Sequence, residues 1–102
     1  MDIVHDGPRL VLTGEFDVRS TMEVRTAIHE RLRGCDEDLI VDLTGVTAVD
    51  VIALRVLAAA TVGAEREGRH LMLRGAGPAV RRMLHLSRLI RVVELERAVA
   101  TA

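Results

Sequence analysis

The order of hydrophobic and polar residues predicts strands in several short segments. DIVH and RLVLTGEF are β-prone runs separated by the turn-forming DGP, so we expect a hairpin over residues 2–14. The run DLIVDL, residues 38–43, is nearly all apolar, as expected of a strand covered on both faces. HLMLRG, residues 70–75, predicts another buried strand, and RVVEL predicts a short strand or helical tail.

Three other segments predict helices. The first begins at Ser20, because Ser20 and Glu23 have the spacing of a capping box in which Ser20 accepts from the Glu23 amide, and it ends near Gly34. The second runs from Val51 to Gly68 with the 3.6-residue period of a helix, and the third is GPAVRRMLHL. The stripe expected to be buried in the first helix is Met22, Val24 or Arg25, Ala27 or Ile28, and Leu32.

The order of these elements predicts a small α/β domain. Strand, helix and strand follow one another over residues 38–75, which by default form a right-handed βαβ unit. A chain of 102 residues without linkers or repeats is expected to form one domain, residues 1–102.

Composition narrows the class of protein. The chain is 49% hydrophobic and 28% charged, which is typical of a folded domain. No apolar run approaches the roughly 18 residues that span a bilayer, and the first residues do not resemble a signal peptide, so we expect a cytoplasmic location without membrane insertion. The single cysteine, Cys35, is followed by three acidic residues that disfavour a thiolate, and we expect it to be inert.

Charge gives no reason to expect nucleic acid as a partner. The net charge is −1, although the first fifty residues carry a balance of −6 and the remainder +5. Phe16 is the only aromatic residue, so no aromatic side chains stand between the arginines to stack on bases.

Candidate enzymatic, metal and nucleotide chemistry is weak. Solvation and helix capping explain the carboxylates of Asp42 and Asp50 without catalysis. The histidines fall on separate predicted elements and lack metal-ligand spacing, so neither a metal nor another cofactor is expected; they are His5, His29, His70 and His85. The glycine-rich LRGAGP could bind a nucleotide phosphate, but Pro78 removes one amide donor and a simple turn is favoured.

The run LIVDLTGVTAVD, its following helix and HLMLRGAGPAVRRMLHLSRLIRVVEL together resemble the STAS domain family, the anti-anti-sigma factors. TGEFDV is similar to the early GELD segment of that family, and the resemblance covers nearly the whole chain. It implies a small STAS-like α/β domain, with helices packed against a mixed sheet of four or five strands, that works by binding another protein. In the signalling branch the partner is an anti-sigma factor that is also a serine kinase, and binding frees the sigma factor.

The resemblance also implies where the regulatory switch lies. The family's site is typically Asp-Ser-Ser/Thr-Gly-Leu at the start of the second helix, where the first serine accepts phosphate. The matching residues here are Asp50, Val51, Ile52, Ala53 and Leu54. Because a valine has no oxygen to phosphorylate, we expect no phosphorylation at the helix start. A switch at Thr44, Thr47 or Cys35 stays open.

The start of the second helix is also where residue spacing predicts a binding face. Asp50 is placed to cap the helix by accepting from the amide of Ile52 or Ala53. If Leu54, Leu57 and Thr61 face the sheet, the stripe of Val51, Arg55, Ala58 or Ala59, and Val62 is partly exposed and suits docking.

We therefore expect a regulatory protein without catalytic activity. Its partner-binding residues are Asp17, Asp50, Val51, Ile52 and Arg55, which we call the helix-start face. Two alternatives remain: an accessory STAS subunit of a membrane transporter or lipid-trafficking assembly, and a nucleotide-binding sensor that uses LRGAGP.

Overall fold

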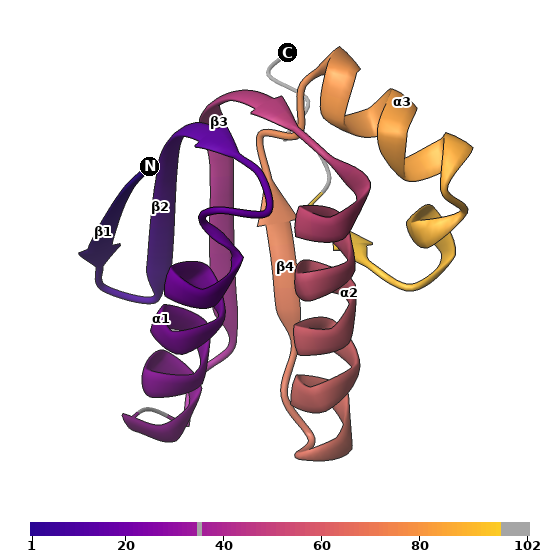
Figure 1. Cartoon of the computed structure of the whole chain (residues 1–102). Coiled ribbons are helices and arrows are strands. Elements are labelled where there is room, and N and C mark those ends of the chain that lie inside the picture. The colour runs from indigo at the N-terminus through magenta and orange to yellow at the C-terminus, as the bar shows by residue number, and fades with distance from the viewer. Residues whose placement is uncertain (35, 97–102) are drawn as a thin grey trace, which may run out of the picture.

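The computed structural model describes residues 1–34 and 36–96, which form a five-stranded mixed sheet with helices packed against it (Figure 1). The strands lie in chain order: β1 (Asp2–Asp6), β2 (Arg9–Phe16), β3 (Leu39–Val49), β4 (Leu71–Arg74) and β5 (Glu94–Leu95). β1 is antiparallel to β2, and every later pair is parallel. The helices are α1 (Thr21–Gly34), α2 (Val51–Arg66), α3 (Pro78–Leu86) and the short 3-10 helix η1 (Leu89–Arg91). The expected fold class is confirmed.

α1 and α2 cover the same face of the sheet. Each connects two neighbouring parallel strands, β2 to β3 and β3 to β4, and successive right-handed crossovers place their helices on one side. The two helices lie side by side in front of the sheet in Figure 1. Strand residues that alternate toward them, such as Leu10, Val41 and Leu73, are fully buried. The prediction that residues 38–43 would be covered on both faces is met in part: on the opposite face Asp42 is 8% exposed, whereas Ile40 is only half-buried.

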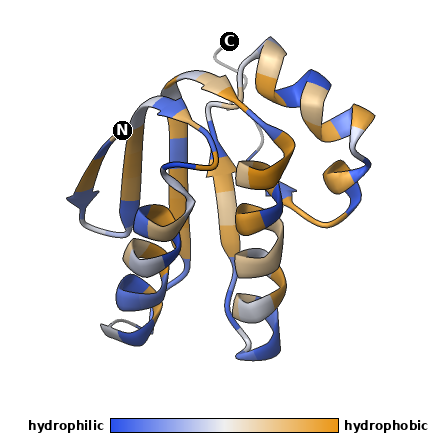
Figure 2. Ribbon diagram, viewed as in Figure 1, coloured by the Kyte–Doolittle hydropathy of each residue, from blue (hydrophilic) through white to orange (hydrophobic). Residues whose placement is uncertain are grey.

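The core is built from aliphatic side chains around one aromatic ring. Figure 2 shows the hydrophobic residues concentrated in the central strands, while the last turns of α1 and α2 are hydrophilic. The largest fully buried side chains are Phe16, Leu10, Leu12, Ile28, Leu39, Leu43, Leu54, Leu57, Leu71, Leu73, Leu84 and Val24. Leu54, Leu57 and Thr61 face the sheet as expected, and this orientation decides which side of α2 is exposed.

Most predicted elements are confirmed, and the main difference lies at the end of β3. The hairpin forms, and RVVEL contributes the strand β5 after η1. β3 extends to Val49, beyond the predicted end at residue 43, because its second half pairs with β2 across two irregularities in register. That extension carries the chain along the edge of β2 to the start of α2.

The predicted capping box at Ser20 is wrong. Ser20 is buried, and its hydroxyl donates to the carbonyl of Glu15 at 3.3 Å instead of accepting from the Glu23 amide. Thr21 donates to the carbonyl of Val18 at 3.0 Å. These bonds join the start of α1 to the end of β2 and to the turn that follows it.

Gly75 is needed for the turn after β4. Its φ is +71°, in the left-handed region that side chains other than glycine adopt at a cost. A Cβ at this position would overlap the hydroxyl of Thr44 and come within 3.1 Å of the Thr44 amide nitrogen. The turn therefore packs its backbone directly on β3.

We predict that Gly75→Ala destabilises the protein by about 1–3 kcal/mol, because it combines left-handed strain with overlap on Thr44. The matched control is Gly63→Ala in α2, where an added Cβ meets no atom within 4 Å. That substitution should stabilise the helix by up to about 1 kcal/mol. Urea unfolding of both variants measures the difference, and equal stabilities would contradict the description of the turn.

Candidate functional site

Asp50 holds the start of α2 against the turn that follows β2. Its Oδ1 accepts from the amide of Ala53 at 2.8 Å, which confirms the predicted helix cap. Its Oδ2 accepts from the amide of Val18 at 3.2 Å, and its own amide donates to the carbonyl of Phe16 at 3.3 Å. One carboxylate thereby brings together two segments of the helix-start face that lie 32 residues apart in the sequence.

Asp17 has its charge balanced within the same turn. The amide of Arg19 donates to Asp17 Oδ1 at 3.0 Å, and the Arg19 guanidinium reaches Asp17 Oδ2 at 2.7 Å and Glu15 at 3.2 Å. The side-chain hydrogen bonds from Arg19, with its amide bond and charge, lower the pKa of Asp17. Asp17 lies between Phe16 and Val18, the two residues of the turn that Asp50 contacts, and its carboxylate is engaged by Arg19.

The exposed side of α2 begins with apolar side chains. Val51 is half-buried, Ile52 is 48% exposed, and Arg55 is exposed. Further along the same helix Ala59 is exposed and Val62 half-buried, whereas Ala58 is buried. The expectation of a partly exposed stripe is thus confirmed.

Two neighbouring hydrophobic residues were missed by sequence reasoning. Val18 is 57% exposed and Met22 is 68% exposed, although Met22 was expected in the buried stripe of α1. The buried residues of α1 are Val24, Ala27 and Ile28. At 100° per residue, Met22 lies about 200° around the helix from Val24, so the spacing itself marks it as exposed. Val18 lies in the turn that Asp50 binds, whereas Met22 lies on the side of α1 that faces Ile3 and His5 of β1.

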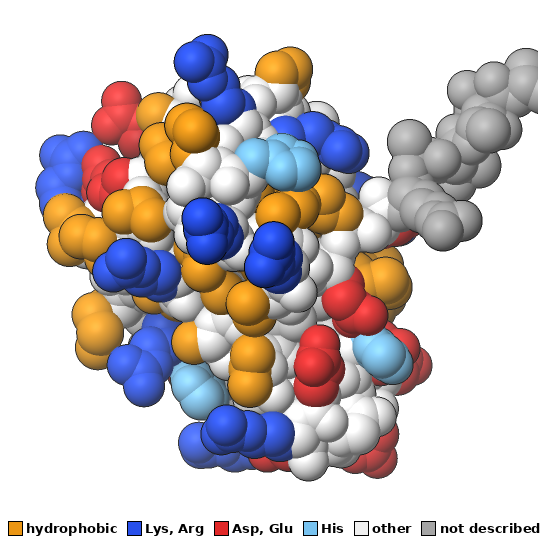
Figure 3. Space-filling view, turned by 90° about the vertical axis from the view of Figure 1, so that its right-hand side faces the viewer, with side chains coloured by type: hydrophobic (Ala, Val, Ile, Leu, Met, Phe, Trp, Pro, Cys, Tyr) orange, Lys and Arg blue, Asp and Glu red, His pale blue; other side chains and the backbone are white. Residues whose placement is uncertain are grey.

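Hydrophobic and basic side chains share much of the α2–α3 side of the molecule. Figure 3 looks onto that side, where hydrophobic residues and arginines intermingle while acidic residues gather toward the upper left and lower right. Such a mixture of apolar contact area and arginine is typical of protein interfaces.

Asp42 and Asp50 do not form an acid–base pair. Asp42 lies in β3 and Asp50 directly follows it, eight residues later, which is roughly 26 Å at about 3.3 Å per residue. Asp42 is 8% exposed and accepts from the Thr44 amide at 2.9 Å, with an Arg9 guanidinium nitrogen 3.8 Å away. Burial opposes its ionisation, but the hydrogen bonds from Thr44 and the charges of Arg9 and Arg74 outweigh burial and lower the pKa of Asp42.

The other sites considered from the sequence are the LRGAGP segment, a metal site, a membrane span and Cys35. In LRGAGP the Ala76 carbonyl accepts from Arg81 Nε at 2.9 Å, and Gly77 is the N-cap residue of α3, which favours the turn interpretation over nucleotide binding. The described residues contain no group of three or more potential ligands that could hold a metal ion. No described helix has both the length and the apolar character needed to cross a bilayer. Cys35 lies outside the described residues.

Comparison with known families gives one match. The family model described as "Mlab, STAS domain" matches residues 1–94. No curated protein matches the chain.

Solved structures with the same fold are distant in sequence. A proposed anti-sigma factor antagonist from Thermotoga maritima has a TM-score of 0.78 and 17% identity, over 97% of this chain and 87% of that one. An anti-sigma factor antagonist from Mycobacterium paratuberculosis has a TM-score of 0.71 and 23% identity, over 95% and 84%. A sulfate transporter family protein from Wolinella succinogenes has a TM-score of 0.65 and 17% identity, over 86% and 73%. At these identities the similarity concerns the fold alone.

We predict that Asp42 contributes pH-dependent stability. Its folded pKa lies below the ordinary 3.8, so the contribution is fully present above that pH and is lost as pH falls through the lowered value. Asp42→Asn keeps an acceptor for Thr44 but removes the charge beside Arg9. The melting temperatures of wild type and variant should differ most near neutral pH and converge in acid; a constant difference would contradict this account.

We predict that Asp50→Ala costs about 1–2 kcal/mol of stability, because it removes the cap of α2 and the acceptor of the Val18 amide. Asp50→Asn is the control, since its single amide oxygen can still cap the helix, and it should lose less. Chemical denaturation gives both values. Amide exchange at Val18 should rise in the alanine variant, and unchanged exchange would argue against the second bond.

Proposed function

Because the chain belongs to the STAS domain family, we propose that it is a non-catalytic regulatory domain, similar to anti-anti-sigma factors, that works in the cytoplasm by binding another protein. The observation that supports this most is the helix-start face. Ile52 is exposed at the beginning of α2, and Asp50 fixes that helix against the turn at Asp17. A rigid apolar surface with arginine beside it suits a protein partner.

The proposed partner is an anti-sigma factor of the serine-kinase kind. This identity rests on the fold shared with anti-sigma factor antagonists and on the sequence resemblance around Asp50. We further propose that Val51 occupies the family's phosphoacceptor position, so that binding is not switched off by phosphate at the helix start.

A second candidate is an accessory subunit of a membrane transporter or lipid-trafficking assembly. The fold similarity to a sulfate transporter family protein favours it. The two candidates differ in partner but use the same face. Affinity capture from an extract of the source organism, followed by mass spectrometry, separates kinase-like proteins from transporter subunits.

We predict that Val51→Asp separates binding from folding. A carboxylate in the first turn of a helix is stabilising by roughly 0.3–1 kcal/mol, which offsets the loss of a half-buried valine, so the melting temperature should stay near that of wild type. At an interface, desolvating the new charge beside Asp50 costs about 2 kcal/mol or more, on the order of thirtyfold in affinity. Calorimetry with the captured partner measures the change.

Val51→Thr provides the matched control, because threonine has the shape of valine and adds only a hydroxyl. It should retain binding, and it should become a substrate if the captured partner is a serine/threonine kinase. A large loss of stability in Val51→Asp would place Val51 in the core. Unchanged binding in that variant would mean that the partner docks elsewhere.

A further inference from the structure

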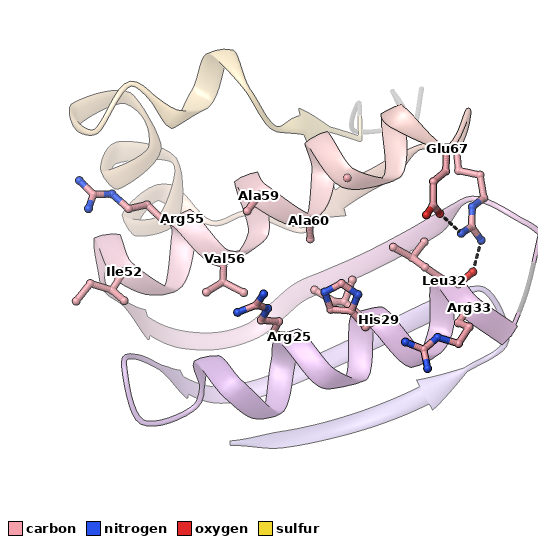
Figure 4. Close-up of a pocket in the computed structure, with 13 residues that line it drawn as sticks. Arg25, His29, Leu32, Arg33, Ile52, Arg55, Val56, Ala59, Ala60 and Glu67 are labelled. Atoms are coloured by element: carbon pink, nitrogen blue, oxygen red, sulfur yellow. Dashed lines mark hydrogen bonds and ion pairs between the residues drawn. The ribbon is translucent and has the colours of Figure 1, made fainter.

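α1 and α2 leave an open groove between them on the side away from the sheet (Figure 4). Its volume is about 690 Å³, and its apolar lining includes Ile28 and Leu32 of α1 and Val56 of α2. The groove is open because the residues of α2 that line it include Ala59, Ala60 and Gly63, which are too small to fill the space between the helices.

The groove is lined by basic side chains on both walls. Arg25, His29 and Arg33 come from α1, and Arg55 comes from the first turns of α2. Within the part of the chain that the structure describes, Arg25, Arg33 and Arg55 have no acidic group at ion-pair distance. Glu67 is the one acidic residue of the lining, and it pairs with Arg69 at 2.8 Å. The positive charge of the groove is thus left for an occupant to balance.

We propose that this groove binds an acidic amphipathic helix of the partner protein. A helix can place apolar residues at positions i, i+3, i+4 and i+7 on the groove floor while acidic residues on its flanks meet the two walls. This proposal rests on the proposed function and extends it, since Ile52 and Arg55 belong to both the groove and the helix-start face.

The distribution of charge favours a helix over a small anionic amphiphile. The volume lies within the range of about 300–1,000 Å³ that small ligands also use, so size does not decide. An amphiphile has one anionic head group and needs cations gathered at one end. Arg25 and Arg33 are instead two turns apart, about 12 Å along α1, and Arg55 comes from the first turns of α2, where its side chain extends away from α1. Only an occupant with several separated negative charges can meet all three.

The proposal is tested with a designed peptide of about 14 residues, roughly 21 Å long as a helix, with leucines at the four anchor positions and glutamates elsewhere. One tryptophan in the peptide reports binding, because the protein contains none. Saturable binding with a blue shift of tryptophan emission is expected. A second peptide with lysine in place of glutamate should bind at least tenfold more weakly, and equal binding of the two would overturn the proposal.

Three protein variants locate the site. Arg25→Glu reverses a charge on one wall of the groove, and Ala59→Phe fills the groove. Each variant should bind the acidic peptide about tenfold or more weakly, while its melting temperature stays near that of wild type. The control is Arg82→Glu, which makes the same change of charge on an exposed position of α3 outside the groove. It should alter affinity less than twofold. An equal loss in Arg82→Glu would overturn the proposal, because the attraction would then be general.

Two further measurements separate the remaining explanations. Dodecanoate should not displace the acidic peptide. Displacement at micromolar concentration would overturn the proposal of a helical occupant and favour an anionic amphiphile. With the captured partner, Arg25→Glu should reduce binding as Val51→Asp does. If only Val51→Asp reduces partner binding, the groove proposal fails while the proposed function stands. If neither variant reduces it, the proposal that the partner binds the helix-start face fails as well.

Discussion

The bond between the Asp50 carboxylate and the Val18 amide determines how the exposed surface is assembled. β3 must run to Val49 to deliver Asp50 to this position, and the irregular pairing with β2 permits that length. The same carboxylate caps α2 through Ala53, so the direction of the helix and the position of the turn are set by one side chain. Without it, Ile52 and Val18 would belong to two separate segments.

Periodicity was sufficient to predict most of the elements and the orientation of α2, while the mixed sheet was implied by the family resemblance. Leu54, Leu57 and Thr61 repeat at helical spacing, and burying them left Arg55 exposed and Val51 half-buried, as expected. The predicted cap at Asp50 was correct because capping depends on neighbouring residues. The capping box at Ser20 was wrong because the Ser20 hydroxyl donates to the carbonyl of Glu15 at the end of β2, a contact that the pattern of the helix itself does not indicate. Likewise, how far each face of β3 is covered depends on where the helices pack, which the residues of the strand do not indicate.

The groove could not have been predicted from either helix alone. Ala59, Ala60 and Gly63 indicate only that α2 has a side of small residues, and Arg25 and Arg33 indicate only a basic side of α1. These features face each other because both crossovers place their helices on the same side of the sheet. The groove therefore forms because the topology brings together two helix surfaces, neither of which indicates a binding site by its sequence alone.

The groove is also fixed at both ends by polar bonds. At one end Asp50 connects α2 to the turn before α1, and at the other the guanidinium of Arg69 donates to the carbonyl of Leu32 at the end of α1. Two helices restrained in this way have little conformational entropy left to lose when a partner arrives. The ordering cost of association then falls on the partner. A segment that is already helical when free will bind more tightly than one of the same sequence composition that must fold on contact.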